Sequence, residues 1–150
     1  MIHIASVQTT AVGNVGGGED NLMSYTLPVG KLDLDTKGVR VTAWGSFVNN
    51  ANSKTLKLYF GSTAILSNAL TINVGDNWKI EASVHRTGSD AQDYVSQITT
   101  VTTALAASTV TSRGSLTEDD GATIVIKCTG EATSDNDIVQ EGLFVEFITP

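Results

Sequence analysis

The sequence predicts an all-β domain, a sandwich or barrel of short antiparallel strands. Apolar and polar residues alternate with period two over 38–47 and again over 54–61, and the Asn-rich segment 49–53 between them is typical of a β-hairpin turn. Similar runs recur along the chain at short spacing, with almost no helical periodicity. A chain of 150 residues, 41% of them hydrophobic, is long enough to bury a core of its own, so we expect one domain.

The first 21 residues divide into two parts. Residues 2–12 favour β structure but carry few apolar side chains, and residues 13–20 are rich in glycine, which predicts a flexible hinge. Two alternatives stay open: an ordinary first strand followed by a loop, or an extended N-terminal arm that docks on a neighbouring subunit. We take 1–21 as the arm and Gly-rich hinge, and 22–150 as the β-sandwich domain.

Pro28 ends the first strand after the hinge, because proline has no backbone N–H to donate to a sheet. The threonine-rich region 92–120 is ambiguous, since residues 104–107 would also suit a helical turn. The predicted strands are 22–27, 38–48, 54–60, 63–74, 78–87, 92–103, 122–130 and 138–149.

Two strands carry large apolar side chains on both faces. If Val39, Val41, Ala43 and Phe47 point into the core, Trp44 points away from it. In residues 143–148, the side chains on each of the two faces include large apolar groups. Strands of this kind are usually buried on both faces, whereas a two-layer sandwich buries only one face of each of its sheets. The outward side chains therefore predict either cover from elsewhere in the chain or a subunit interface. The candidate interface residues are Ile2, Ile4, Val7, Trp44, Phe144 and Ile148.

Catalytic motifs are absent from the sequence. His3 and His85 lie far apart and outside any zinc-binding pattern, no Gly-x-Ser-x-Gly elbow occurs, and the glycines at 16–18 lack the strand-to-helix context of a phosphate-binding loop. A glycosidase on a β-scaffold would need two paired carboxylates, and Glu81 and Glu146 are too isolated to nominate. We expect no enzyme activity and no cofactor.

Two further side-chain types have competing interpretations. Asp119-Asp120, Asp135-Asn136-Asp137 and Ser89-Asp90 could gather oxygens around Ca²⁺, but none matches an EF-hand, so we expect solvated turn residues and no metal site. The single cysteine, Cys128, cannot form an internal disulfide and shares a face with Ile124 and Ile126, so we expect it to be buried and inert.

A net charge of −7, from 16 acidic and 9 basic residues, argues against a nucleic-acid partner and suits docking on a basic surface. The N-terminus lacks the pattern of a signal peptide, and no apolar run is long enough to cross a membrane. We expect synthesis in a cytoplasm and no membrane insertion.

Several segments together resemble a domain found among tailed-bacteriophage virion proteins. The resemblance spans roughly residues 13–148. The segments that carry it are Gly13–Gly16, Glu19–Pro28, Ala43–Gly61, Trp78–Gly88, Ile124–Gly130 and Asp137–Gln140.

The resemblance implies a jelly-roll-like antiparallel β-sandwich that tends to form trimers and has no catalytic residues. It implies a virion structural protein made in the host cytoplasm. One alternative is a capsid decoration or head-fibre-type protein, held to the major capsid protein or another virion protein through Met1–Val15. The other alternative is a tail or baseplate component. In the latter case Tyr94 and the turn at Asn49–Asn52 would contact a host-surface glycan. Neither a collagen-like shaft nor a coiled-coil heptad is present, which favours a small accessory subunit over a full tail fibre.

Overall fold

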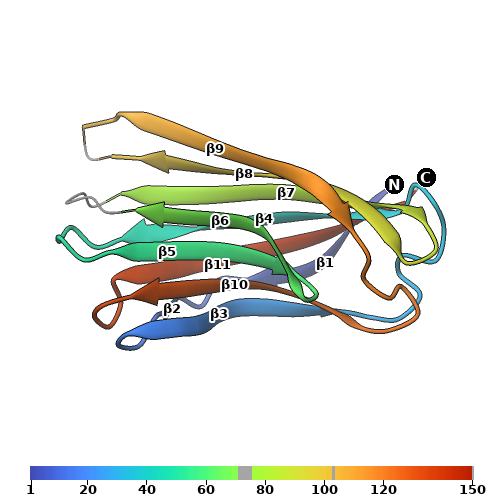
Figure 1. Cartoon of the computed structure of the whole chain (residues 1–150), viewed down its shortest axis with the longest axis horizontal. Coiled ribbons are helices and arrows are strands. Elements are labelled where there is room, and N and C mark those ends of the chain that lie inside the picture. The colour runs from blue at the N-terminus through green and yellow to red at the C-terminus, as the bar shows by residue number, and fades with distance from the viewer. Residues whose placement is uncertain (71–75, 103, 150) are drawn as a thin grey trace.

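Short alternating segments build two packed antiparallel sheets in the computed structural model, which describes residues 1–70, 76–102 and 104–149 (Figure 1). The strands are β1 (Ile2–Gln8), β2 (Val12–Gly13), β3 (Gly18–Leu27), β4 (Gly38–Phe47), β5 (Lys54–Phe60), β6 (Thr63–Leu70), β7 (Asn77–Gly88), β8 (Ala91–Val101), β9 (Ala107–Leu116), β10 (Ile124–Ala132) and β11 (Ile138–Ile148). The predicted all-β fold is confirmed.

Sheet A has the strand order β1-β11-β4-β7-β8-β9, with β2 also paired to β11, and sheet B has the order β3-β10-β5-β6. The chain passes from one sheet to the other between β2 and β3, β3 and β4, β4 and β5, β6 and β7, β9 and β10, and β10 and β11. These crossings make the sandwich jelly-roll-like. Both chain termini lie at one end of it, together with the turn between β9 and β10 (Figure 1).

The core fills the space between the sheets, because each strand presents every second side chain to it. Val39, Val41 and Ala43 of β4 are fully buried, as the alternation predicted. Sheet B contributes the alternate residues Leu56, Leu58 and Phe60 of β5 and Ile124, Ile126 and Cys128 of β10.

Residues 2–8 form an edge strand of sheet A, the first of the two alternatives for this segment. β1 pairs with β11 from Ile2↔Ile148 to Gln8↔Leu143, and β2 continues along the same neighbour. The glycine-rich segment that follows is held by hydrogen bonds: Asn14 exchanges backbone hydrogen bonds with Ile138 and Asn136, and Asp135 accepts one from the Gly16 N–H at 2.6 Å. β3 then begins at Gly18, inside the segment predicted as hinge.

The ambiguous region 92–120 forms a strand pair. β8 and β9 pair antiparallel from Gln92↔Leu116 to Val101↔Ala107, so the sequence prediction missed the strand β9. Of the possible helical turn at 104–107, residues 104–106 lie in the connection, with Leu105 at positive φ, and Ala107 begins β9. The alternation failed here because β9 extends past the edge of sheet B and is exposed on both faces along most of its length. The predicted ends of strands 63–74 and 92–103 include residues outside the described part of the chain.

Within the described residues, the structure has no helix long and apolar enough to cross a membrane.

Candidate interaction face

The six residues predicted at an interface lie on one surface, the outer face of sheet A. Ile2 pairs with Ile148 and Val7 with Phe144, and directly paired residues of an antiparallel sheet point to the same side. Trp44 of β4 lies beside Phe144 of β11 on that side. We call Ile2, Ile4, Val7, Trp44, Phe144 and Ile148 the apolar patch.

Trp44 and Phe144 form the centre of the apolar patch. Their ring centroids are 4.8 Å apart with an interplanar angle of 79°, the edge-to-face geometry that aromatic pairs prefer. The indole ring lies directly over Gly142, where a Cβ atom would overlap it. The absent side chain at Gly142 therefore lets the ring lie flat on the sheet.

Much of the apolar patch is open to solvent. Ile4 is 71% exposed, Val7 53%, Ile2 52% and Phe144 37%. No described segment of the chain covers them, so the intramolecular cover considered from the sequence is absent from this part of the structure. Exposed apolar patches of this kind are typical of interaction sites, so the predicted interface stays a prediction for this face.

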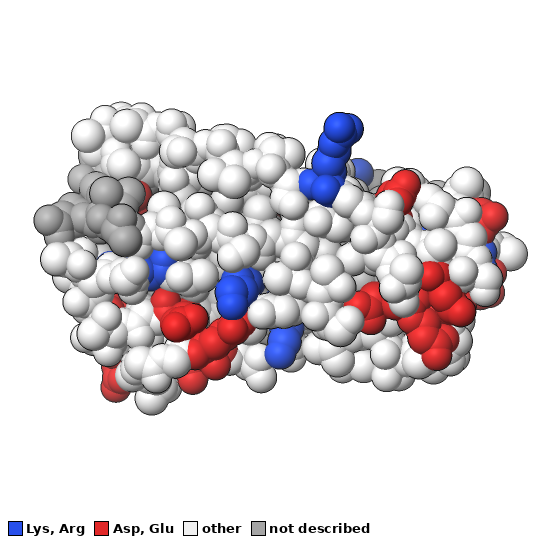
Figure 2. Space-filling view, viewed as in Figure 1, with Lys and Arg blue, Asp and Glu red and all other residues white. Residues whose placement is uncertain are grey.

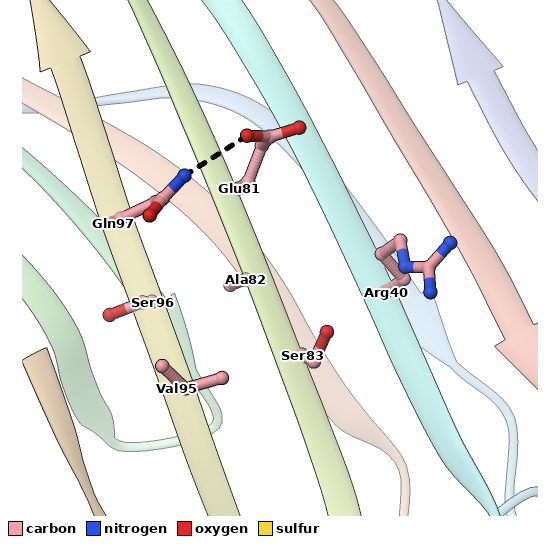
Figure 3. Close-up of a pocket in the computed structure, with 7 residues that line it drawn as sticks. All are labelled: Arg40, Glu81, Ala82, Ser83, Val95, Ser96 and Gln97. Carbon is pink, nitrogen blue, oxygen red and sulfur yellow. Dashed lines mark hydrogen bonds between the residues drawn. The ribbon is translucent and has the colours of Figure 1, made fainter. Parts of the chain in front are cut away.

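Charged side chains of both signs lie next to the apolar patch on the same face. Arg40 and Glu146 are paired across β4 and β11, and on β7 the Lys79 ammonium lies 2.8 Å from the Glu81 carboxylate. An open hollow of about 180 Å³ lies here, lined by Arg40 of β4, Glu81 of β7 and Gln97 of β8 (Figure 3). The Gln97 amide donates to Glu81 at 3.2 Å. Arg40, Lys79 and Glu81 thus lie beside the apolar patch, whereas Glu146 lies within it, opposite Ile4.

The outer face of sheet B differs, because its polar groups bind one another. The Glu19 carboxylate accepts hydrogen bonds from Lys57 at 2.8 Å, Tyr59 at 2.9 Å and Thr129 at 2.6 Å. The bonds from Lys57 and Thr129 are the main reason that the pKa of Glu19 falls to about 2. Figure 2 shows this face, on which acidic and basic side chains lie next to one another below its middle.

The side chains predicted for glycan contact are engaged within the fold. In the Asn49–Asn52 turn, the Asn50 and Asn52 amides donate to the Asp137 carboxylate at 2.6 and 2.8 Å, and the Lys54 ammonium donates to Asn50. Tyr94 faces inward opposite Val84 and packs against the core. The amides thus stabilise the turn and the tyrosine ring packs on the interior layer, while Asn49 of the turn is exposed, so glycan contact by these residues stays a prediction.

The acidic loop residues separate into two places. Asp137 is buried among the Asn amides described above, whereas carboxylate oxygens of Asp90, Asp119 and Asp120 lie within 4.8 Å of one another at the end that carries the termini. Asp120 accepts a hydrogen bond from the Arg86 guanidinium at 2.5 Å, and the backbone N–H groups of Asp90 and Asp120 each donate to the other residue's carboxylate. These contacts account for the closeness of the Asp90 and Asp120 carboxylates.

Two residues considered for chemistry have the surroundings that the sequence indicated. Cys128 is fully buried, and burial raises the pKa of its thiol to about 12, so the nucleophilic thiolate does not form near neutral pH. His85 is exposed on the outer face of β7.

Sequence reasoning missed three groupings that depend on strand order. These are the Arg40–Glu81–Gln97 hollow, the hydrogen bonds around Glu19, and a cavity beside Asp76 where β6 and β8 end. Glu19 and Thr129 are 110 positions apart, so no local pattern could connect them.

No family model matches this chain, and no curated protein matches it. Among solved structures, the chain is similar to the CBM2 module of the evolved Dit of Lactobacillus casei BL23 phage J-1. The identity is 12%, the alignment covers 97% of this chain and 95% of that one, and the TM-score is 0.45.

Proposed function

We propose that this chain is a non-enzymatic structural protein of a bacteriophage virion, a homotrimeric capsid decoration or head-fibre-type protein. The observation that carries the proposal is the exposed apolar patch on the outer face of sheet A. Burying such side chains releases about 25 cal/mol per Å² of apolar surface, which makes association favourable. The virion context comes from the resemblance of residues 13–148 described above.

A second copy of the same chain is the occupant that best fits the apolar patch. The surface in and beside the patch carries Arg40 and Lys79 as well as Glu81 and Glu146, so it is complementary to itself in charge even though the chain as a whole is acidic. A strongly acidic or strongly basic partner would leave one of these sets unpaired. The edge strand β1 lies within the patch and can contribute both side chains and free backbone groups.

The end of the sandwich that carries the termini is the proposed contact with the shell. Met1 lies at this end with the turn between β9 and β10 (Figure 1), and acidic side chains gather there (Figure 2). That turn contributes Glu118, Asp119 and Asp120. A basic capsid surface would complement them, and the charges would set orientation more than affinity.

Two measurements test this function. The first is the mass of the purified protein by light scattering, where we expect a trimer and a monomer would contradict the proposed interface. The second is co-sedimentation with capsid shells and, separately, with tails of the parent phage over a range of salt concentrations. Binding to shells that weakens with salt supports decoration, binding to tails only would overturn it, and binding unaffected by salt would refute the role of the acidic end.

A second candidate function, a tail or baseplate component that binds a host-surface glycan, is favoured by one observation on sheet B. Tyr59, Lys127, Asn21 and Glu19 line an open hollow of about 320 Å³, in which the Lys127 ammonium lies 5.3 Å from the Tyr59 ring centroid. An aromatic ring surrounded by donors and acceptors suits a sugar ring. A glycan array compares the wild-type chain with Tyr59→Ala. Binding lost in the variant would support this function, and no signal with the wild-type chain would refute it.

A further inference from the structure

A small cavity opens between the sheets at the end opposite the termini. It has a volume of about 110 Å³ and lies where β6 ends, β8 ends and β9 begins. Ser108 and Val110 of β9 are exposed at it, whereas Asp76, Ile98 and Thr100 are buried. The cavity therefore has an open side at β9 and a buried interior.

Asp76 is the unusual residue of this cavity. Its side chain is 2% exposed, and its Oδ1 atom accepts no hydrogen bond from any described residue. A buried carboxylate oxygen without a partner is costly, so natural proteins rarely keep one unless it has a role. Burial also raises the pKa of this carboxyl group, as expected for an acid that lacks a compensating charge.

Three of the four other polar side chains around the cavity are available for a ligand, while the Thr102 hydroxyl accepts a hydrogen bond from the Ala106 N–H. The side chains of Asn68, Thr100 and Ser108 line it, and among the described residues none of the three forms a side-chain hydrogen bond. Each offers an oxygen acceptor. Leu70, Ile98 and Val110 supply apolar wall between these oxygens.

We propose that this cavity binds a primary ammonium group on a short alkyl stem, such as the side chain of a lysine from another protein. The ammonium group has three donors and a positive charge, which match the Asp76 carboxylate and the neighbouring hydroxyl and amide oxygens. The methylene groups of the stem match the apolar wall. A divalent cation suits the cavity less well, because only one carboxylate is present among the described lining residues and such ions prefer several charged oxygens.

The experiment titrates n-butylammonium into the full chain and follows backbone amide shifts by NMR, with 1-butanol, Ca²⁺, Nα-acetyl-lysine methylamide and glucosamine as parallel probes. We expect saturable shifts in β6, β8 and β9 with n-butylammonium and with the lysine derivative. Equal binding of 1-butanol would overturn the role of the charge, and tighter binding of Ca²⁺ would replace the proposal with a metal site. Binding of glucosamine alone would indicate an amino sugar instead of an alkyl stem.

Two variants locate the site. Asp76→Asn should weaken n-butylammonium binding at least about tenfold, since a hydrogen bond to a charged group is lost, while Glu131→Gln, the same charge change at an exposed position of β10, should leave it unchanged. Ser108→Leu should block the open side and abolish the shifts without removing the acid. If neither Asp76→Asn nor Ser108→Leu affects binding, the ammonium group binds elsewhere and the proposal fails.

Stability gives an independent readout. A carboxylate kept for a ligand is not needed by the free fold, so Asp76→Asn should leave the thermal midpoint of the free protein unchanged or raise it. A clear fall in the midpoint would show that Asp76 has a structural partner and would overturn the proposal.

Discussion

The outer faces of the two sheets differ in how their side chains are satisfied. On sheet B, the charges of Glu19 and Lys57 are paired with each other and with neighbouring hydroxyl groups. On sheet A, Ile2, Ile4 and Val7 extend into solvent beside a Trp44–Phe144 pair that no described segment covers. The described charges of sheet B are thus paired within the chain, whereas the exposed apolar side chains of sheet A are the surface on which the proposed association depends.

The largest expected effect is on association through sheet A. Ile4→Glu combined with Val7→Glu places two carboxylates in the apolar patch, and losing the burial of two aliphatic side chains costs about 3 kcal/mol, or about a hundredfold in the dissociation constant. Sedimentation velocity over a range of protein concentrations measures this change.

The matched control adds the same charge outside the apolar patch. Val125→Glu lies on sheet B, where Val125 is 40% exposed, and Val29→Glu lies in the loop after β3, where Val29 is 57% exposed. The double control variant should associate as the wild type does. An equal loss of association in both double variants would mean that net charge, and not the apolar patch, controls the oligomer.

A smaller effect is expected at the centre of the apolar patch. Gly142→Ala places a methyl group where the Trp44 ring lies, so the ring must move outward. Overpacking of this kind costs about 1–3 kcal/mol in the free energy of unfolding. Denaturant unfolding measures the loss, and Trp44→Ala in the Gly142→Ala background should remove most of the clash. If Gly142→Ala is as stable as the wild type, Trp44 does not depend on this glycine.

The smallest effect is expected on sheet B and depends on pH. The pKa of Glu19 is lowered from 4.5 to about 2 in the folded chain, so its contribution to stability is complete above about pH 4.5 and is lost as the pH falls toward 2. Because the side chain is partly exposed to solvent, we expect Glu19→Gln to cost only about 1 kcal/mol near neutral pH.

Unfolding measured at several pH values checks this prediction. The difference between the wild type and Glu19→Gln should shrink at low pH, whereas Glu131→Gln, on the same face, should differ little from the wild type throughout. A difference that does not change with pH would show that the carboxylate charge of Glu19 does not stabilise the sheet.

The sequence predicted the strands whose two faces have different surroundings. β4 and β7 each bury one face, so Val39 and Ile80 alternate with polar residues and the period is clear. β9 was missed because both of its faces meet solvent, and its threonines and serines show no alternation. The N-terminal strand was left open for a related reason, since Ile2 and Ile4 are exposed on the single chain.

The fold class, the core faces, the burial of Cys128 and the outward direction of Trp44 follow from the alternation of neighbouring residues along one strand, so they could be predicted from the sequence. Which strands lie side by side depends on contacts between distant segments and is seen only in the folded chain. Strand order placed β1 next to β11 and thereby joined Ile2, Ile4 and Val7 to Phe144 in one patch. It also paired the Asn50 and Asn52 amides with Asp137 and left Asp76 buried without a described partner. These contacts join residues that are far apart in the sequence, and local periodicity contains no information about them.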